Sequence, residues 1–234
     1  MKELEKKIKI KFKNPQLLRQ ALIHRSYLNE HPEEKLDHNE RLEFLGDSII
    51  EFVITEYLYK NFSQPEGVLT SWRASLVNTK MLAKIAKKLN LDKYLYLSKG
   101  ELLYSSEKAK TGILANAFEA LVGAIYLDQG LEKTRKFIKE KLINQLKLIL
   151  KYGLYKDAKS KFQELAQADF KITPTYKVLK ETGPEHAKEF VVGLFLNEKK
   201  ISQGRGKSKQ EAEMKAARSA LKKYNKIKLC ILKN

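Results

Sequence analysis

The chain has 234 residues, with 46 Lys and Arg against 28 Asp and Glu, so its formal net charge of +18 favours a polyanionic partner, nucleic acid ahead of an anionic membrane surface. One cysteine, Cys230, excludes a disulfide framework or a multi-cysteine metal site and fits a reducing cytosol. We expect neither a signal peptide at the charged N-terminus nor a membrane span, because no apolar run is long enough.

Residues 1–38 are predicted to be mostly helical, with one helix beginning near Pro15, a residue suited to a first helical turn. The histidines of this region have no metal-binding spacing, so local hydrogen bonding is the favoured interpretation. These histidines are His24, His31 and His38.

The next predicted helix, from about Glu40 to Asn61, carries an acidic stripe. Glu40, Glu43, Asp47 and Glu51 lie at i, i+3, i+7 and i+11, so they span only about 80° of the helix circumference. Apolar residues flank the stripe and cover the opposite side, so we expect this helix to be buried nearly all round. Buried, unpaired carboxylates are very costly. A hard divalent cation such as Mg²⁺ is therefore favoured over a solvated acidic surface.

The start of this helix, NERLEFLGDS at residues 39–48, resembles the signature of the ribonuclease III family, which cuts double-stranded RNA. The resemblance implies Mg²⁺-dependent phosphodiester hydrolysis, with Mn²⁺ as an alternative, leaving 5′-phosphate and 3′-hydroxyl ends in rRNA and mRNA processing in the cytoplasm. It also implies a homodimer with one cutting centre per subunit, in which Phe44 is a dimer contact. From its position alone, Phe44 would be a core residue.

A break at residues 63–67 precedes a helix predicted through residues 69–77. Glu66 has two interpretations, because a carboxylate near a helix N-terminus is favourable in itself. The resemblance of PEGVLTSWRASLVN to the family's second acidic segment implies instead that Glu66 lies at the edge of the active-site valley. An amphipathic helix over 80–97 and a turn at 98–101 are predicted to follow.

Residues 112–128 are predicted to form a core helix whose interior holds one charged residue, Glu119. A lone buried carboxylate needs a cation or a hydrogen-bond donor. Glu119 could form a salt bridge with Arg41 or Arg73. We favour instead that Glu119 lies beside the carboxylates of the 39–48 signature, with a divalent cation between them. Several small residues would allow a second helix to approach closely: Ala115, Ala117, Ala120, Gly123 and Ala124.

Three residues before Glu119 the resemblance implies an aspartate, where this chain has Asn116. The amide lacks the negative charge, so weaker cation binding is expected. Either an Asp was changed to Asn to hold RNA without cutting it, which the regular match elsewhere favours, or Asn116 is natural and the remaining carboxylates retain activity. A double-stranded RNA-binding protein that does not cut is the rival class. The predicted metal ligands are Glu43, Asp47, Asn116 and Glu119, with Asp47 and Glu119 catalytic and Glu40 and Glu66 secondary.

After a last helix over 131–151 and a short linker, the pattern changes to helix, three strands and helix. We predict an all-α endonuclease domain at residues 1–151 and a small α+β (α-β-β-β-α) domain at 156–225. In the second domain, Ser208 and Glu211 have the spacing of a capping box at the start of the final helix.

This second domain resembles a double-stranded RNA-binding domain in residues 161–164, 183–186 and 206–212. Such domains recognise the shape of A-form RNA across two minor grooves. Lys207 and Lys209 could instead be an ordinary solvated helix start, and His186 a plain turn residue. Gln210 stands where the family commonly has a lysine, which removes one phosphate partner. The predicted RNA contacts are Gln163, Glu164, His186, Lys207, Ser208 and Lys209.

Overall fold

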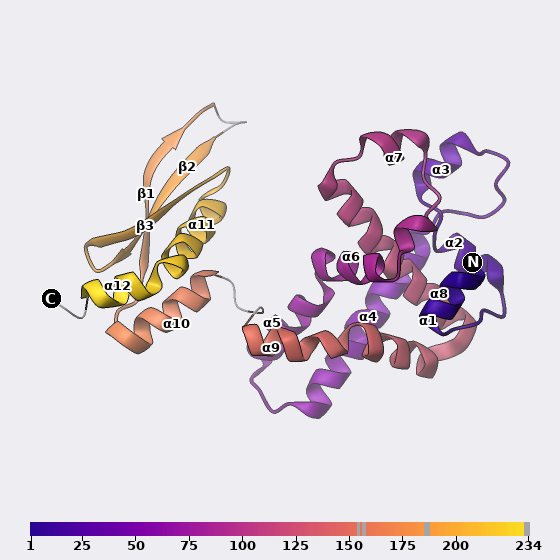
Figure 1. Cartoon of the computed structure of the whole chain (residues 1–234), viewed down its shortest axis with the longest axis horizontal. Helices are drawn as coiled ribbons and strands as arrows, with labels where there is room; N and C mark the ends of the chain where they lie inside the picture. Colours follow the sequence, from indigo (N-terminus) through magenta and orange to yellow (C-terminus); the bar gives the residue numbers. More distant parts are fainter. Residues whose placement is uncertain (154, 156–157, 185–187, 232–234) are drawn as a thin grey trace. The chain divides into compact units, whose positions relative to one another are not determined.

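The computed structural model describes residues 1–153, 155, 158–184 and 188–231 (Figure 1). The chain divides into two compact units, Met1–Tyr155 and Lys156–Asn234. The first unit is helical and the second combines helices with one small sheet, in agreement with the predicted fold class. No helix within the described ranges has the length and apolar character needed to cross a membrane.

The first unit consists of helices joined by short loops. Side chains cap several of these helices; the Asn14 side chain accepts from the backbone N–H of Gln16, and Pro15 occupies the first turn as predicted. The helices are α1 (Lys2–Ile8), α2 (Pro15–Gln20), α3 (Arg25–Glu30), α4 (Glu40–Asn61), α5 (Glu66–Val77), α6 (Thr79–Lys88), α7 (Lys99–Tyr104), α8 (Glu107–Lys141) and α9 (Leu146–Tyr152).

Two local predictions in this unit are wrong. The helix predicted over 80–97 ends at Lys88, because Asn90 has φ of 57°, which interrupts helical geometry. The turn predicted at 98–101 is the start of α7, because the Ser98 side chain accepts a hydrogen bond from the N–H of Glu101 and begins a helix there. The helices predicted over 112–128 and 131–151 are partly joined in α8, which bends at Gly130.

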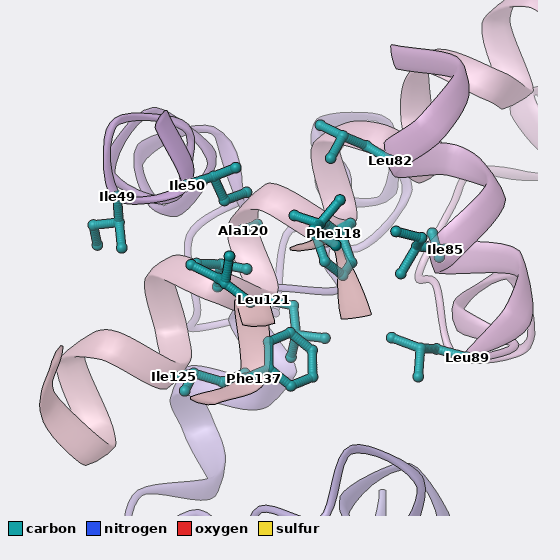
Figure 2. Packing of buried hydrophobic residues seen from close by; sticks show 14 of the residues in the cluster. Ile49, Ile50, Leu82, Ile85, Leu89, Phe118, Ala120, Leu121, Ile125 and Phe137 are labelled. Atoms are coloured by element: carbon teal, nitrogen blue, oxygen red, sulfur yellow. The ribbon is translucent and has the colours of Figure 1, made fainter. Parts of the chain in front are cut away.

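Helix α8 lies at the centre of the core of this unit. Phe118, Leu121 and Ile125 are completely buried. Figure 2 shows side chains of α6 on one side of these residues and Ile49 and Ile50 of α4 on the other. The position of this part of α8 between two partner helices explains why Glu119 is the one charged residue between Lys110 and Asp128.

Helix α4 is not buried all round, in contrast to the expectation. One face packs into the core through Ile50, Val53 and Ile54, but Phe44 is 78% exposed and Phe52 is 52% exposed. Helix α8 covers one side of α4, whereas the acidic and aromatic side lies at the surface of the single chain. An apolar sequence pattern cannot distinguish burial in the core from an exposed apolar surface.

The second unit contains an antiparallel sheet in the order β1-β2-β3, with helices against one face. Its core joins Phe162 of the first helix, Leu194 of the middle strand and Ala216 of the last long helix. The helix, three strands and helix follow the predicted order. The elements are α10 (Ala158–Phe170), β1 (Thr175–Thr182), β2 (Glu189–Leu196), β3 (Lys199–Gly206), α11 (Lys209–Lys222) and α12 (Tyr224–Ile231).

Helix α12 has no counterpart in the sequence predictions. The Tyr224 hydroxyl donates to the carbonyl oxygen of Leu165 and contacts Asp169 Oδ2, both at 2.8 Å. Lys228 Nζ lies 2.8 Å from the same Asp169 carboxylate. These contacts fasten α12 to the C-terminal half of α10.

Candidate active site

Helices α4 and α8 touch backbone to backbone where Gly46 and Gly123 meet. A Cβ added to Gly46 would lie 2.6 Å from the carbonyl carbon of Glu119 and 3.0 Å from the backbone nitrogen of Gly123. A Cβ added to Gly123 would lie 3.2 Å from the carbonyl carbon of Leu42. Neither position has room for a side chain, so glycine is required on both helices. The close approach predicted from the small residues of α8 is confirmed at Gly123.

This crossing brings the acidic residues of the two helices together. Glu43 lies nearly one turn before Gly46 on α4, and Asp47 follows Gly46 directly. On α8, Glu119 lies about one turn before Gly123. Burial, followed by the negative charges of Asp47 and Glu43, raises the pKa of Glu119 to about 7. The contributions of Asp47 and Glu43 place both carboxylates within electrostatic reach of Glu119.

The other two carboxylates are shifted in the same direction. Burial first, and then the charge of Glu40, raises the pKa of Glu43, while the Asn116 side chain opposes that rise. Burial and the charge of Glu51 raise the pKa of Asp47. Asn116 therefore joins the cluster from α8, on the side that faces Glu43.

Within the described parts of the chain, no ion pair neutralises Glu43, Asp47 or Glu119. Arg73, one of the two predicted alternatives for Glu119, donates instead to the hydroxyl of Thr55 at 2.9 Å. The other alternative, Arg41, is exposed and does not contribute to the shifted pKa of Glu119. The cluster thus holds like charges without a protein cation.

The donor set fits a hard divalent cation. Three carboxylates and one amide offer only oxygen ligands, which Mg²⁺ and Mn²⁺ accept. As the side chains lie, the described residues contain no group of three or more His, Cys, Asp or Glu already positioned around one ion. Asp47 is exposed, so its side chain has room to turn towards Glu43 and Glu119.

Glu40 and Glu66 lie in different surroundings. Glu40 is exposed at the start of α4, where Arg25 lies 3.6 Å and His38 3.8 Å from its carboxylate. Its charge reaches Glu43, so it borders the cluster. Glu66 is exposed at the start of α5 and accepts a hydrogen bond from Thr70 at 3.4 Å. In the residues that the structure describes, Glu66 has no contact with the carboxylates of α4 and α8.

The N-terminal histidines have local partners, as expected. The His24 Nδ1 accepts from the N–H of Ser26 at 3.3 Å and caps α3. His31 stacks on Tyr27, with ring centroids 4.0 Å apart. His38 lies beside Glu40. These contacts account for the histidines without a metal.

Phe44 points out of the first unit at the edge of the cluster. With Leu127, which is 54% exposed, it borders a shallow hollow beside Glu40 and Arg41. The alternative that Phe44 is a core residue is wrong for the single chain. Its assignment as a dimer contact stays a prediction.

In the second unit, most predicted RNA contacts lie at the surface of α10 and at the start of α11. Gln163 and Glu164 are exposed on α10. The Ser208 hydroxyl accepts from the N–H of Glu211, and the Glu211 carboxylate accepts from the N–H of Lys207 at 2.8 Å. The Ser208 half of the expected capping box is thus formed, whereas Glu211 reaches back to Lys207 instead of Ser208. The two hydrogen bonds fix the backbone beside Lys207 and Lys209. His186 lies outside the described residues.

The sequence interpretation missed two features of the first unit. Gly46 received no role, although a glycine inside a helical pattern signals close backbone approach. Tyr59, which is 80% exposed, extends the aromatic surface of α4 beyond Phe44 and Phe52. The spacing of Phe44, Phe52 and Tyr59 places them on one side of α4, which could have indicated that this side is exposed.

Comparisons with known proteins agree with this arrangement. The sequence model of the family described as Ribonuclease-III-like matches residues 14–146, and the Double-stranded RNA binding motif matches residues 158–224. Among curated relatives, Ribonuclease 3 of Nitratiruptor sp. is 44% identical over 223 residues, which cover 95% of this chain and 96% of the relative. Ribonuclease 3 of Borreliella burgdorferi is 45% identical, with coverage of 95% and 90%.

Solved structures give the same result for the first unit. A nuclease domain of ribonuclease III from Campylobacter jejuni superposes with a TM-score of 0.52 at 38% sequence identity. The match covers 59% of this chain and 96% of that domain. That structure is described in terms of structural flexibility in the region involved in dimer formation.

Proposed function

This chain belongs to the ribonuclease III family, and we propose that it is an endoribonuclease that hydrolyses phosphodiester bonds in double-stranded RNA with Mg²⁺. Residues 1–151 form the proposed catalytic domain and residues 156–225 the proposed RNA-binding domain. The observation that carries the proposal is the crossing at Gly46 and Gly123, which gathers carboxylates from two helices without a protein cation.

The proposed ligands are the carboxylates of Glu43, Asp47 and Glu119 and the amide oxygen of Asn116. When bound, Mg²⁺, or Mn²⁺ in its place, supplies Lewis-acid activation of a water molecule and neutralises charge on the phosphate. Asp47 on α4 and Glu119 on α8 are the proposed catalytic residues among these ligands. The proposed products carry 5′-phosphate and 3′-hydroxyl ends.

Glu40 and Glu66 are proposed as secondary acidic residues with different positions. The charge of Glu40 already acts on Glu43. Glu66 is separate from the cluster in one chain, so any role it has at a cutting centre would need an RNA substrate or a second copy of the chain to bring them together.

The second unit is the proposed RNA anchor. Backbone N–H groups at the start of α11 favour phosphate, and Lys207 and Lys209 add positive charge beside them. Gln163 and Glu164 on α10 present polar groups suited to 2′-hydroxyls, and His186 is the proposed contact between β1 and β2. Ser208 holds the start of α11 in place.

We further propose a homodimer in the cytoplasm that processes rRNA and mRNA. The exposure of Phe44 supports the dimer, because an aromatic ring that is 78% exposed in one chain gains from burial against another. The single cysteine fits a reducing compartment.

Asn116 favours a second candidate, a double-stranded RNA-binding protein that does not cut. The amide removes one negative charge from the ligand set, and cation affinity falls with ligand charge. Weaker cation binding at Asn116 would reduce cleavage to the same extent whether the residue is natural or introduced.

The deciding experiment incubates long duplex RNA and Mg²⁺ with this chain and, in parallel, with Asn116→Asp. We expect both proteins to release short duplexes, the Asp variant faster. Cleavage by the Asp variant alone would establish the non-cutting candidate for this chain, and cleavage by neither would refute the nuclease proposal. An Asn116→Asp, Glu119→Gln double variant, expected to be inactive, shows that cutting comes from this cluster.

A further inference from the structure

Helix α6 carries four lysines on its outer face, which we call the lysine stripe. At 100° per residue these side chains fall within about 100° of the helix circumference. All four are exposed, whereas Leu82, Ile85, Ala86 and Leu89 on the other face are buried. Core packing therefore fixes the direction in which the stripe points. The stripe consists of Lys80, Lys84, Lys87 and Lys88.

No acidic residue balances this charge within the helix. The sequence of α6, TKMLAKIAKK, has no Asp or Glu, and none of the four lysines forms an ion pair with a residue that the structure describes. Lys80 and Lys84, like Lys84 and Lys88, are like-charged pairs at i and i+4, which destabilise a helix.

The helix dipole accounts for the positions of only two of the four lysines. Lys87 and Lys88 lie in the last turn, where positive charge is favourable. Lys80 lies in the first turn, where positive charge is unfavourable. Helix stability thus does not account for Lys80 and Lys84. Binding of an external anion would offset their positive charge.

The stripe is separate from the carboxylate cluster. Figure 2 shows Leu82 and Ile85 of α6, and Leu89 just after its end, on the Phe118 side of the helix and away from Ile49 and Ile50 of α4. The lysines occupy the opposite face of α6, so they point away from α8. A polyanion on the stripe would therefore lie outside the site where α4 meets α8.

We propose that the lysine stripe binds the phosphate backbone of duplex RNA outside the segment that is cut. This inference rests on the proposed function, because it takes double-stranded RNA as the ligand of the chain. From Lys80 to Lys88 the stripe covers about 12 Å of a rigid helix, so several cations can contact one phosphate backbone together. An anionic membrane fits less well, because the apolar face of α6 is buried in the core and cannot insert.

The test compares two triple variants of the full chain. Lys80→Gln, Lys84→Gln, Lys87→Gln removes most of the stripe, and Gln has nearly the same helix propensity as Lys. The control removes three other exposed lysines that form no ion pair with a described residue. Those control substitutions are Lys136→Gln, Lys139→Gln and Lys147→Gln.

Affinity for a duplex of about 50 base pairs, roughly three times the span of one RNA-binding domain, is measured in EDTA so that no RNA is cut. The dissociation constant is followed between about 50 and 200 mM salt. Each lost phosphate contact lowers the slope of log affinity against log salt by about 0.7–0.9, so we expect a loss of roughly 2 for the stripe variant. The control should lose far less, and both variants should melt like the parent chain.

Equal losses in the two triple variants would show that only net charge matters, and the inference would then be wrong. An unchanged slope in the stripe variant would also overturn it. Loss of binding to phosphatidylglycerol vesicles, with RNA binding intact, would assign the stripe to a membrane surface. If the parent chain itself does not bind the duplex, the proposed function fails, which is a different result from failure of the stripe alone.

Discussion

The Asn116 side chain on α8 acts on the carboxylate of Glu43 on α4, where it opposes the rise in the Glu43 pKa that burial and the charge of Glu40 cause. The amide thus stabilises the ionised form of Glu43 in the absence of a cation. An aspartate at the same position would add a fourth negative charge to the cluster. The identity of residue 116 therefore sets the balance between stability without metal and affinity for metal.

Asn116→Asp should lower stability without metal and raise affinity for Mg²⁺. In EDTA we expect a loss of about 1 kcal/mol, which lowers the melting temperature by roughly 2–4 °C in a chain of this size. With Mg²⁺ the order should reverse, because bound ligand stabilises the folded state and the affinity should rise about tenfold or more. Calorimetric titration with Mg²⁺ and thermal melting check both parts. Asn116→Ser, which keeps the site neutral, should not gain affinity.

Glu119→Gln should stabilise the metal-free protein at high pH only. The pKa of Glu119 is about 7 in the folded state, above its ordinary value of 4.5, so the folded state favours the protonated form. Its favourable contribution is complete below pH 4.5 and is lost as pH rises through about 7. Because the side chain is only partly buried, we expect the variant to gain about 1 kcal/mol at pH 8. Melting in EDTA at pH 4.5 and pH 8 measures this, and an equal gain at both values would contradict the assigned pKa.

Gly46→Ala should destabilise the first unit, because the added Cβ would overlap the carbonyl group of Glu119. Overpacking against backbone cannot be relieved by a rotamer change, so we expect a loss of at least about 2–3 kcal/mol in urea unfolding. Gly112→Ala on α8 is the matched control, since a Cβ there would meet nothing within 4 Å. That substitution should instead stabilise the helix by up to about 1 kcal/mol. Similar losses for the two variants would show that the crossing is looser than described.

The sequence predicted those parts of the structure that depend on local periodicity. The acidic stripe on α4, the isolated Glu119 and the capping box at Ser208 are all visible as fixed spacings along one helix. The structure brings the acidic stripe and Glu119 together. The sequence suggested this, because a buried carboxylate needs a partner.

Other features depend on what lies beside an element in space, and sequence spacing does not show that. Phe44 and Phe52 follow the same apolar pattern as Ile50, yet they are exposed because α8 covers only one side of α4. Ser98 acts as a helix cap rather than a turn residue because α7 continues after it. Glu66 is exposed at the start of α5, where its described hydrogen bond comes from Thr70 of the same helix.

Lys207→Gln and Lys209→Gln should weaken RNA binding with little loss of stability, because both side chains are exposed at the start of α11. Lys209→Gln also removes a cation 5.8 Å from the centre of the Phe190 ring, a contact worth about 0.5–1 kcal/mol at an exposed site. Each substitution should lower the salt slope of duplex binding by about 0.7–0.9. Ser208→Ala separates positioning from charge, since it removes a helix cap and should cost about 1 kcal/mol of stability. Binding titrations at several salt concentrations, together with melting curves, distinguish the two effects. A salt slope that does not change in either lysine variant would exclude phosphate contacts there.

Phe44→Ser should convert the proposed dimer to a monomer while each chain keeps its fold. The ring is 78% exposed in one chain, so its loss leaves no cavity in the core. Burial of an aromatic ring against a partner contributes about 1.5–3 kcal/mol, and a symmetric interface contains the residue twice. The dissociation constant of the dimer should therefore rise by at least a hundredfold, or about 3 kcal/mol. Sedimentation over a range of concentrations measures this change.

Leu103→Ser, which alters a residue that is 70% exposed on α7, is the control and should leave the dimer intact. A Phe44→Ser protein that sediments like the parent chain would rule out this surface as the dimer contact.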